Sequence, residues 1–386
     1  MKAVILAAGE GTRLEPLTNV RPKPMVPVAN KPILEHVLEA VIAAGIDEII
    51  LVVGYKRQRI QNYFGDGNDW GVDITYVIQD TQLGSGHALL EAEAEIGSGL
   101  VVLNGDQIVE PSAIEGVIEK RNQTGHTAMA VSRSAETQLY GVLNVEDGIA
   151  VDLLEKPEAT AIDSDVVNAG VYAFGPHIFA ALRETESEGE LGLTTALATH
   201  LDDHPVEIVG YDGVWFDITR PWDLLTANGH LLDTHAQATH DTSIHESAAI
   251  ANDSLIGANS TVHPNATILR ETALGANISI GANTVIENAI VMDDATIGPS
   301  TTIRDCIVGA NATIGPGCIA EGGETTVVLE ETVHRDVRFG GIVGDNAEIR
   351  GGATVAPGAR LGNDSTVESR CVLEGTYEPG STVRRG

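Results

Sequence analysis

The chain has 386 residues, enough for two or three domains with a substantial core, and its hydrophobic content of 43% is ordinary for a globular protein. Its formal net charge of −32 excludes binding of nucleic acid or of an anionic membrane through bulk electrostatics, because those partners need a basic face. Three cysteines, without a CxxC pair and odd in number, argue against a disulfide framework.

The chain opens with a predicted strand at 2–7 (KAVILA), followed by a loop with two glycines, Gly9 and Gly11. Three cations come close behind: Arg13, Arg21 and Lys23. Backbone N–H groups of such a loop can bind phosphate, and cationic side chains add charge. The dinucleotide fingerprint needs a third glycine where Leu14 stands, and the P-loop needs GK followed by Ser or Thr, which is absent. We therefore expect a phosphate site of another type.

Short aliphatic runs alternate with helical patterns up to about residue 220. Strands are predicted at 2–7, 48–53, 74–78 and 100–104, and helices at 33–44, 56–63 and 85–95. This alternation predicts a Rossmann-like α/β domain with a mostly parallel sheet covered on both faces. Ligands of such sheets bind beyond the carboxyl ends of the strands, where the opening loop and Asp106 of LNGDQ are expected.

A different pattern begins near residue 241. Aliphatic residues recur every six positions from Ile244 to Ile286, continue after one-residue slips to Ile314, and return from Val343 to Leu373 after a non-repeating stretch at 316–342. Such hexapeptides predict a left-handed parallel β-helix with three hexapeptides per coil. The helical pattern at 221–240 is expected to connect the two parts. The predicted domains are 1–228 and 241–386, joined by a helical linker at 229–240.

Seven short motifs occur in a fixed order along the first domain. They are GTRLEPLT…RPKPM, QLGSGHA at 82–88, NGD at 104–106, YGVL at 140–143, EKP at 155–157, NAG at 168–170 and WFDI at 215–218. Together they resemble the sugar-1-phosphate nucleotidylyltransferases, in particular the archaeal branch related to the bifunctional N-acetylglucosamine-1-phosphate uridylyltransferases. The resemblance spans the whole chain, because many members append a hexapeptide β-helix.

The resemblance implies that a nucleoside triphosphate reacts with a sugar 1-phosphate and that pyrophosphate leaves. The attacking phosphate oxygen is already an anion at neutral pH, so catalysis is mainly positioning and charge neutralisation. By the resemblance, Arg13 would hold the β- and γ-phosphates, Lys23 the α-phosphate, and Lys156 the sugar phosphate. Asp106 and Asp217 look like the family's paired metal ligands, a set that suits Mg²⁺.

The resemblance also implies which residues contact the base and the sugar. Gln79 aligns with the glutamine that reads the base; its amide matches O4 and N3–H of uracil or thymine. Because an amide can flip, Gln79 alone does not exclude cytosine. The other nucleotide contacts are expected at Leu6, Ala8, Gly9, Gly11, Thr12, Gly84 and Ser85. Contacts to the sugar hydroxyls are expected at Gly141, Glu155 and Asn168. The choice between UTP and dTTP, and between glucose 1-phosphate and N-acetylglucosamine 1-phosphate, stays open.

Bifunctional relatives acetylate an amino sugar in their β-helix, with a catalytic His before a GxG coil and lysines in a following loop. Here the coil before Gly315-Pro316-Gly317 contains no His, and no lysine follows residue 240. His334 with Arg335 and Arg338 is the only group in the 316–342 stretch that could replace them. We therefore expect an oligomerising β-helix, in a trimer or a dimer of trimers, rather than an acetyltransferase.

Only six lysines stand against 17 arginines, and the acidic excess resembles adaptation to high salt in a halophilic archaeon. No apolar run reaches the length of a membrane span, and the start lacks a signal-peptide pattern, so we expect a cytoplasmic protein. Two alternatives to a uridylyl- or thymidylyltransferase remain: a bifunctional enzyme that also uses acetyl-CoA, and a regulatory paralogue without activity.

Overall fold

The structure, a computed structural model, describes residues 1–386 except 159–163, 188, 202, 236–240, 331 and 386. The described chain divides into two compact units. Unit 1 comprises Met1–Glu10 and Ile33–Asp217, and unit 2 comprises Gly11–Pro32 and Ile218–Gly386. The segment that follows the first strand thus packs with the C-terminal part of the chain. The expected boundaries at 228 and 241 remain a prediction about independently folding domains.

Unit 1 is built on a nine-stranded sheet in the order β5-β4-β1-β6-β11-β8-β12-β10-β9. In chain order its strands are β1 (Lys2–Ala7), β4 (Glu48–Val53), β5 (Asp73–Ile78), β6 (Leu100–Asn104), β8 (Thr127–Arg133), β9 (Gly141–Glu146), β10 (Ile149–Glu155), β11 (Val166–Phe174) and β12 (Val206–Gly210). The four strands β5, β4, β1 and β6 are parallel, as the sequence pattern predicts. The other half is largely antiparallel, since β11 runs against β6 and β8, and β10 runs against β9 and β12.

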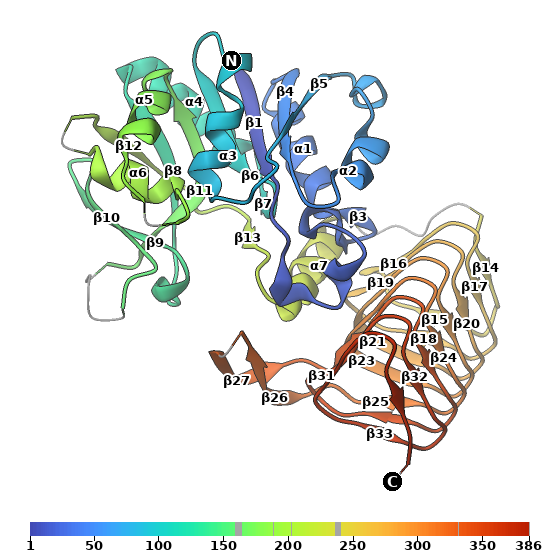
Figure 1. The fold of residues 1–386 in the computed structure, drawn as a ribbon. Helices are drawn as coiled ribbons and strands as arrows, with labels where there is room; N and C mark the ends of the chain where they lie inside the picture. Colours follow the sequence, from blue (N-terminus) through green and yellow to red (C-terminus); the bar gives the residue numbers. More distant parts are fainter. Residues whose placement is uncertain (159–163, 188, 202, 236–240, 331, 386) are drawn as a thin grey trace. The chain divides into compact units, whose positions relative to one another are not determined.

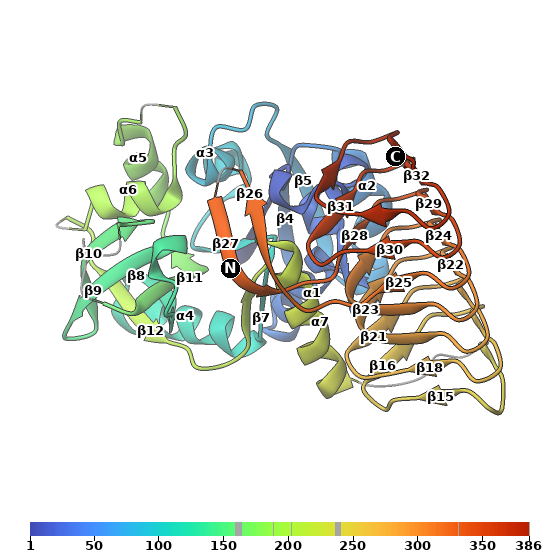
Figure 2. The same ribbon diagram turned by 90° about the horizontal axis from the view of Figure 1, so that it is seen from below.

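Helices cover both faces of this sheet (Figure 2). The helices of unit 1 are α1 (Ile33–Ala43), α2 (Arg57–Phe64), α3 (Ser85–Glu91), α4 (Pro111–Thr124), α5 (His177–Glu184) and α6 (Leu193–Thr199). Helices α3, α5 and α6 pack with Val4, Ile50 and Val102 in one buried cluster. Helix α4 contacts β8, β11 and β12 from the other side. Alternate residues of the strands therefore face different helical layers, which explains their continuous apolar sequences.

The C-terminal part of unit 2 is a left-handed parallel β-helix with three faces (Figure 1). One face consists of β14 (Ser243–Ile244), β17 (Thr261–Val262), β20 (Ser279–Ile280), β22 (Thr296–Ile297), β24 (Thr313–Ile314), β29 (Glu348–Ile349), β32 (Thr366–Val367) and β35 (Thr382–Val383). The second has β15 (Ala249–Ile250), β18 (Thr267–Ile268), β21 (Val285–Val291), β23 (Thr302–Val308), β25 (Ile319–Ala320), β30 (Thr354–Val355) and β33 (Val372–Leu373). The third has β16 (Ser254–Ile256), β19 (Thr272–Leu274), β28 (Gly341–Val343), β31 (Ala359–Leu361) and β34 (Thr376–Tyr377), with β21 and β23 turning into it.

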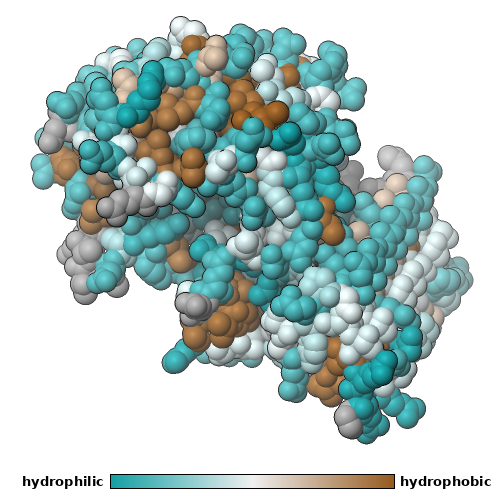
Figure 3. Space-filling model, viewed as in Figure 1, coloured by the Kyte–Doolittle hydropathy of each residue, from teal (hydrophilic) through white to brown (hydrophobic). Residues whose placement is uncertain are grey.

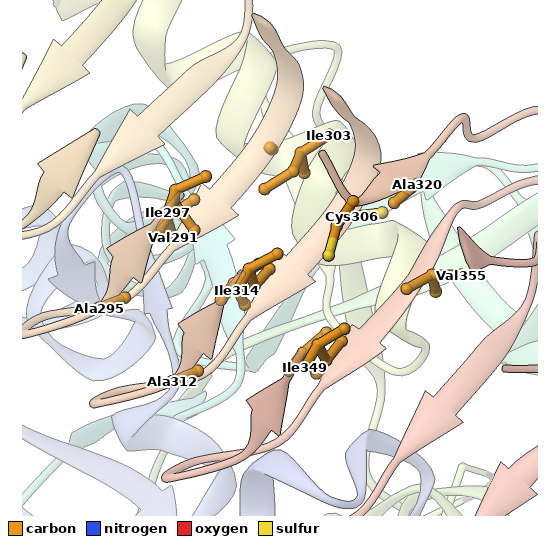
Figure 4. Packing of buried hydrophobic residues seen from close by; sticks show 14 of the residues in the cluster. Val291, Ala295, Ile297, Ile303, Cys306, Ala312, Ile314, Ala320, Ile349 and Val355 are labelled. Carbon is orange, nitrogen blue, oxygen red and sulfur yellow. The ribbon is translucent and has the colours of Figure 1, made fainter. Parts of the chain in front are cut away.

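The six-residue aliphatic rows fill the interior of the β-helix (Figure 4). Ile297, Ile314 and Ile349 stack on consecutive coils, and all three are buried. Ile244 of the first coil is 37% exposed, as expected for a terminal coil that has a neighbour on one side only. Asn and Asp occupy left-handed corners such as Asn265, where the side chain bonds to Asn283 of the next coil at 3.3 Å. The prediction of a hexapeptide β-helix is confirmed.

Two further parts of unit 2 lie outside the repeats. A hairpin of β26 (Glu324–Leu329) and β27 (Thr332–Arg338) leaves the stack between β25 and β28. Helix α7 (Pro221–His235) packs on β19, β21 and β23. The rest of the expected helical linker, 236–240, lies outside the described residues.

The segment Gly11–Pro32 folds as three short 3₁₀ turns, Thr12–Leu14, Leu17–Asn19 and Lys23–Met25. A small hairpin of β2 (Pro27–Val28) and β3 (Lys31–Pro32) follows, and β2 contacts α7. We call residues 11–32 the anchored segment.

Candidate functional site

The end of β1 leads into the glycine loop. Leu6 pairs with Val52 and Asn104 in the sheet, and the carbonyl of the buried Ala8 accepts a hydrogen bond of 2.9 Å from Gln82 Nε2. Gly9 is exposed, and a Cβ there would meet open space. The start of the loop is therefore held by β1 and by Gln82, and its backbone is open to solvent at Gly9.

Gly11 begins the anchored segment in the left-handed region, with φ of +76°. A Cβ at this position would lie 2.6 Å from Cβ of Lys23, so only glycine allows the lysine side chain to lie this close. Thr18 Oγ1 donates to the Gly11 carbonyl at 2.9 Å and fixes the turn. The structure thus brings Gly11 and Lys23, twelve positions apart in sequence, into contact within unit 2.

Thr12 and Arg13 present two donors side by side. Thr12 Oγ1 lies 2.5 Å from Oε1 of Glu330, and Arg13 Nε lies 2.7 Å from Oε2 of the same carboxylate. The hydrogen bond from Thr12 and the charge of Arg13 hold the pKa of Glu330 below its ordinary value. Two consecutive residues of the anchored segment therefore bind the two oxygens of one oxyanion.

Arg21, the third cation of the opening stretch, has a different environment. Its side chain is only 9% exposed and forms an ion pair with Asp345, whose side chain is 10% exposed. Its guanidinium also contacts the sulfur of Met292. Arg21 is therefore part of the packing of unit 2, which explains why a cation at this position need not bind phosphate.

In unit 1, a two-stranded ladder links the segments that carry Asp106 and Asp217. Strand β7 (Gln107–Val109) follows Asp106 directly, and it pairs antiparallel with β13 (Trp215–Asp217). Asp217 stands opposite Gln107 in the register. The described residues contain no cluster of three or more His, Cys, Asp or Glu side chains suited to a metal. Two hard carboxylates fit a divalent cation that keeps several waters and takes phosphate oxygens as further ligands.

Gln79, Gly84 and Ser85 lie together after β5. Gln79 is 4% exposed, and its Nε2 contacts the Gly84 carbonyl at 3.1 Å and His87 Nδ1 at 3.0 Å. Gly84, with φ of +96°, passes so close to Leu191 that a Cβ would lie 2.5 Å from its carbonyl oxygen. Ser85 begins α3, and its Oγ accepts a bond of 3.0 Å from the Leu193 N–H. These contacts fix Gln79 in one orientation.

The expected sugar-binding residues lie on β9, β10 and β11. Glu155 pairs with Gly141 at the end of the β9–β10 ladder, and the Lys156 N–H donates to the Tyr140 carbonyl at 2.9 Å. Lys156 is in the left-handed region with φ of +45°, and its Nζ lies 3.6 Å from Glu155 Oε1, with both side chains exposed. The structure thus brings Gly141, Glu155 and Lys156 to one end of the ladder.

Asn168 is 9% exposed and already bonded at both ends of its amide. Its Nδ2 donates to the Tyr172 hydroxyl at 2.5 Å, and its Oδ1 accepts from the Gly170 N–H at 2.9 Å. Burial raises the pKa of Tyr172 to about 12, so this phenol stays protonated. Asn168 thus organises the β11 backbone beside Tyr172.

Sequence reasoning had not identified three of these partners: Glu330, His87 and Tyr172. His87 and Tyr172 are close in the chain to Gln79 and Asn168, and the QLGSGHA motif could have pointed to His87. Glu330 lies 317 residues after Arg13, and no local pattern marks it.

Known proteins are similar to this chain over nearly its whole length. The Nucleotidyl transferase family matches residues 2–234, and the EIF2B subunit epsilon LbH domain matches residues 234–338. The "Bifunctional protein GlmU" of Methanococcus maripaludis is 34% identical over 99% of this chain and 97% of its own length. The "Low-salt glycan biosynthesis nucleotidyltransferase Agl11" of Haloferax volcanii is 34% identical over 66% of this chain and 71% of its own length.

Among solved structures, a putative glucose-1-phosphate thymidylyltransferase from Bacillus anthracis superimposes with a TM-score of 0.56 at 27% identity. That match covers 60% of this chain and 94% of the other.

Proposed function

Because the chain belongs to the sugar-1-phosphate nucleotidylyltransferase family, we propose that it transfers a nucleotidyl group from UTP or dTTP to a sugar 1-phosphate and releases pyrophosphate. The sugar phosphate would be glucose 1-phosphate or N-acetylglucosamine 1-phosphate. The observation that carries the proposal is the pair Thr12 and Arg13, whose donors bind both oxygens of one carboxylate. A segment that holds a carboxylate in this way is also suited to a phosphate, which presents oxygens to the same donors.

In the proposed reaction, an oxygen of the sugar phosphate attacks the α-phosphorus in line with the departing pyrophosphate. Arg13 and Thr12 bind the β- and γ-phosphates. Lys23, fixed against Gly11, neutralises charge that develops toward the leaving group, and Lys156 binds the sugar phosphate. None of these residues needs to accept a proton, because the attacking oxygen is already ionised.

Nucleotidyltransferases of this family generally use a divalent metal, and here we propose Mg²⁺. Asp106, which directly precedes β7, and Asp217, opposite Gln107 in the β7–β13 ladder, would hold it. When bound, the cation supplies positive charge to the phosphate oxygens. The protein residues then have to position the two substrates.

The proposed base and sugar contacts follow the same assignment. Gln79, held by Gly84 and His87, would read the pyrimidine, with Leu6, Ala8, Gly9 and Ser85 around the nucleotide. Gly141, Glu155 and Asn168 would contact sugar hydroxyls, with the Asn168 amide oriented by its bond to the Gly170 N–H.

The test is a panel in which purified protein receives each of the four ribonucleoside triphosphates and dTTP, crossed with several sugar 1-phosphates. Pyrophosphate release is measured with Mg²⁺ at high and low salt. We expect turnover with UTP or dTTP and a glucose or N-acetylglucosamine 1-phosphate. Absence of pyrophosphate from every combination would reject the proposed reaction and favour a regulatory role.

A second activity, acetyl transfer from acetyl-CoA, has one observation in its favour: a relative that aligns over 99% of this chain is named bifunctional. The candidate base His334 lies on β27, with its ring packed edge-on to Trp222 at 5.2 Å between centroids. We expect no acetylation, and we propose to follow thiol release from acetyl-CoA with glucosamine 1-phosphate and galactosamine 1-phosphate. Sustained release that His334→Ala abolishes would establish the second activity.

We also propose that the β-helix mediates a homo-oligomer, a trimer or a dimer of trimers, because a symmetric assembly would bury exposed aliphatic side chains such as Val372. Light scattering of the full chain at high salt tests this, and a monomer at micromolar concentration would contradict it.

Among the described residues, no helix is long and apolar enough to cross a membrane.

A further inference from the structure

The anchored segment, residues 11–32, is held by side chains of two neighbouring coils of the β-helix. Asp345 pairs with Arg21 in a buried position. Arg360 Nε donates to the Glu15 carbonyl at 3.1 Å, and burial lowers the pKa of Arg360. These contacts come from residues that the proposed chemistry does not use.

Asp345 is itself fixed by the β-helix. Its Oδ1 accepts a bond of 3.1 Å from the Ala310 N–H, and its own N–H donates to Asn363 Oδ1 at 2.8 Å. Asn363, 3% exposed, uses its Nδ2 to bond the Pro16 carbonyl at 3.0 Å. One connected network therefore joins three successive coils to the backbone at Pro16 and to the side chain of Arg21.

Arg21 lies between Arg13 and Lys23 in the chain, so its position limits where both of these residues can stand. A buried ion pair that loses one partner leaves an uncompensated charge, and the remaining group then moves toward water. If Arg21 moves, the turns that carry Arg13 and Lys23 lose their support. Small displacements of this kind are costly in catalysis, because a misplacement of about 1 Å can reduce a rate by about 10²-fold.

We propose that Asp345 is a positioning residue for nucleotide binding, and that the β-helix sets the geometry of the triphosphate-binding segment. This inference rests on the proposed function for its kinetic consequence. It assigns to the β-helix a part in nucleotidyl transfer, in addition to assembly.

The test compares Asp345→Asn with Asp364→Asn, an exposed corner residue one coil further on, in the full-length protein. For Asp345→Asn we expect kcat/KM for the nucleotide to fall about ten- to hundredfold, while KM for the sugar 1-phosphate changes less than about twofold. Amides of the anchored segment should exchange faster with deuterium, while amides of β20 and β22 keep their protection. Asp364→Asn should show neither effect.

The positioning role would be overturned if the kinetic constants for the nucleotide and for the sugar 1-phosphate changed equally. It would also be overturned if kcat/KM for the nucleotide stayed unaltered while the amides of the anchored segment exchanged faster. The exchange measurement does not depend on activity. If the wild-type protein releases no pyrophosphate with any substrate pair, the proposed function fails, whereas faster exchange in Asp345→Asn still supports the anchoring.

A second inference comes from the hairpin β26–β27, whose base is firmly attached. Arg338 Nε contacts both carboxylate oxygens of Asp305, at 3.1 and 3.0 Å, and the side chain of Asp305 is only 2% exposed. Phe339, fully buried, packs against Trp222 of α7. The hairpin therefore extends from a fixed base.

The tip of this hairpin carries Glu330, which holds Thr12 and Arg13 as described above. Val328 and Val333 on the same hairpin are 57% and 53% exposed, and the space-filling view shows apolar surface there (Figure 3). The visible surface near the tip is thus apolar, whereas the contact with the anchored segment is ionic. The carboxylate occupies donors that the proposed function assigns to the nucleotide phosphates.

We infer that Glu330 competes with the nucleoside triphosphate for Thr12 and Arg13, so that the hairpin restrains nucleotide binding. This inference also rests on the proposed function. The pair is partly exposed, and such pairs are weak, so the restraint is modest and is screened by salt.

The experiment is calorimetric titration of the full-length protein with UTP, dTTP and pyrophosphate. Glu330→Gln should tighten binding of the triphosphate and of pyrophosphate about two- to fivefold at low salt, and the gain should shrink at high salt. Glu321→Gln, which removes an exposed charge from the same insertion, is the control. Weaker or unchanged binding in Glu330→Gln would overturn the inference. A wild-type protein that binds neither pyrophosphate nor triphosphate would instead reject the proposed function.

Discussion

The sheet of unit 1 and the β-helix of unit 2 bury similar aliphatic strands in different ways. In unit 1, helices cover the sheet, so each strand ends in a loop of its own, and the loops after β1 and β6 carry Gly9 and Asp106. In the β-helix, each coil covers the next one, and its corners repeat. The candidate chemistry of unit 2 therefore lies outside the repeats, in the anchored segment and the hairpin. The regular stack provides support, and the segments outside it carry the candidate residues.

The largest expected effect concerns the interior of the stack. Ile286→Ala removes a fully buried side chain of the β-helix core and should lower the free energy of unfolding by about 2–5 kcal/mol. Val372→Ala, at a site that is 55% exposed, should change it by about 0.5 kcal/mol or less. Denaturant titrations followed by circular dichroism would measure both. Equal losses would contradict the assignment of the repeat row to the core.

Next in size is the loss of a proposed catalytic cation. Lys23→Ala and Lys156→Ala should each slow pyrophosphate release by about 10²-fold or more, because an oriented charge-stabilising group is removed. Lys120→Ala on α4, a lysine without a proposed role, is the matched control. Near-wild-type rates in both folded variants would show that the site is elsewhere.

Substitution of the proposed metal ligands should have a smaller effect, seen in how the rate depends on Mg²⁺ concentration. Asp106→Asn or Asp217→Asn should raise the Mg²⁺ concentration for half-maximal rate at least about tenfold, since even outer-shell changes at metal sites cost about 10–100-fold in affinity. Excess EDTA should stop the reaction. Metal titrations that coincide with the wild type would remove these carboxylates from the metal site.

Salt should affect the whole acidic chain. With a net charge of −32, lowering the salt from about 1 M to 0.1 M lengthens the screening distance from about 3 to 10 Å and increases self-repulsion. We expect Tm to fall by about 4 °C or more, corresponding to roughly 1 kcal/mol or more. A Tm independent of salt would count against adaptation to high salt.

The smallest expected effect concerns unit 1 and the pH dependence of its stability. Burial, and then the nearby His204 and Arg121, lower the pKa of His177 from its ordinary value of 6.5. Because the unfolded chain takes up the proton first, His177 contributes stability above pH 6.5 that is lost as the pH falls through its folded-state pKa. The drop in Tm from about pH 8 to 5 should be smaller in His177→Gln than in the wild type. Identical drops would show that His177 plays no part.

Periodicity predicted much of the fold. The strands at 2–7, 48–53 and 100–104 match β1, β4 and β6, and the aliphatic rows match the β-helix core. The antiparallel half of the sheet was not predicted, because strands such as β9 and β10 are set by long-range pairing rather than by a local pattern. At the candidate site, the family resemblance predicts Asp106 and Asp217 as metal ligands, but not the β7–β13 ladder. It gave no sign that Arg21 is buried against Asp345, since that contact spans 324 residues.

The coil length of the β-helix has a mechanical consequence. Thr267 pairs with Val285, 18 positions later, so each coil is a separate loop of chain stacked on its neighbours. A force applied at the C-terminus should therefore remove coils one at a time, and each would release about 60 Å of extended chain. Peeling from that end would first reach the coils that carry Asn363, Arg360 and Asp345, so pulling on the last strands would release the anchored segment before most of the stack has opened.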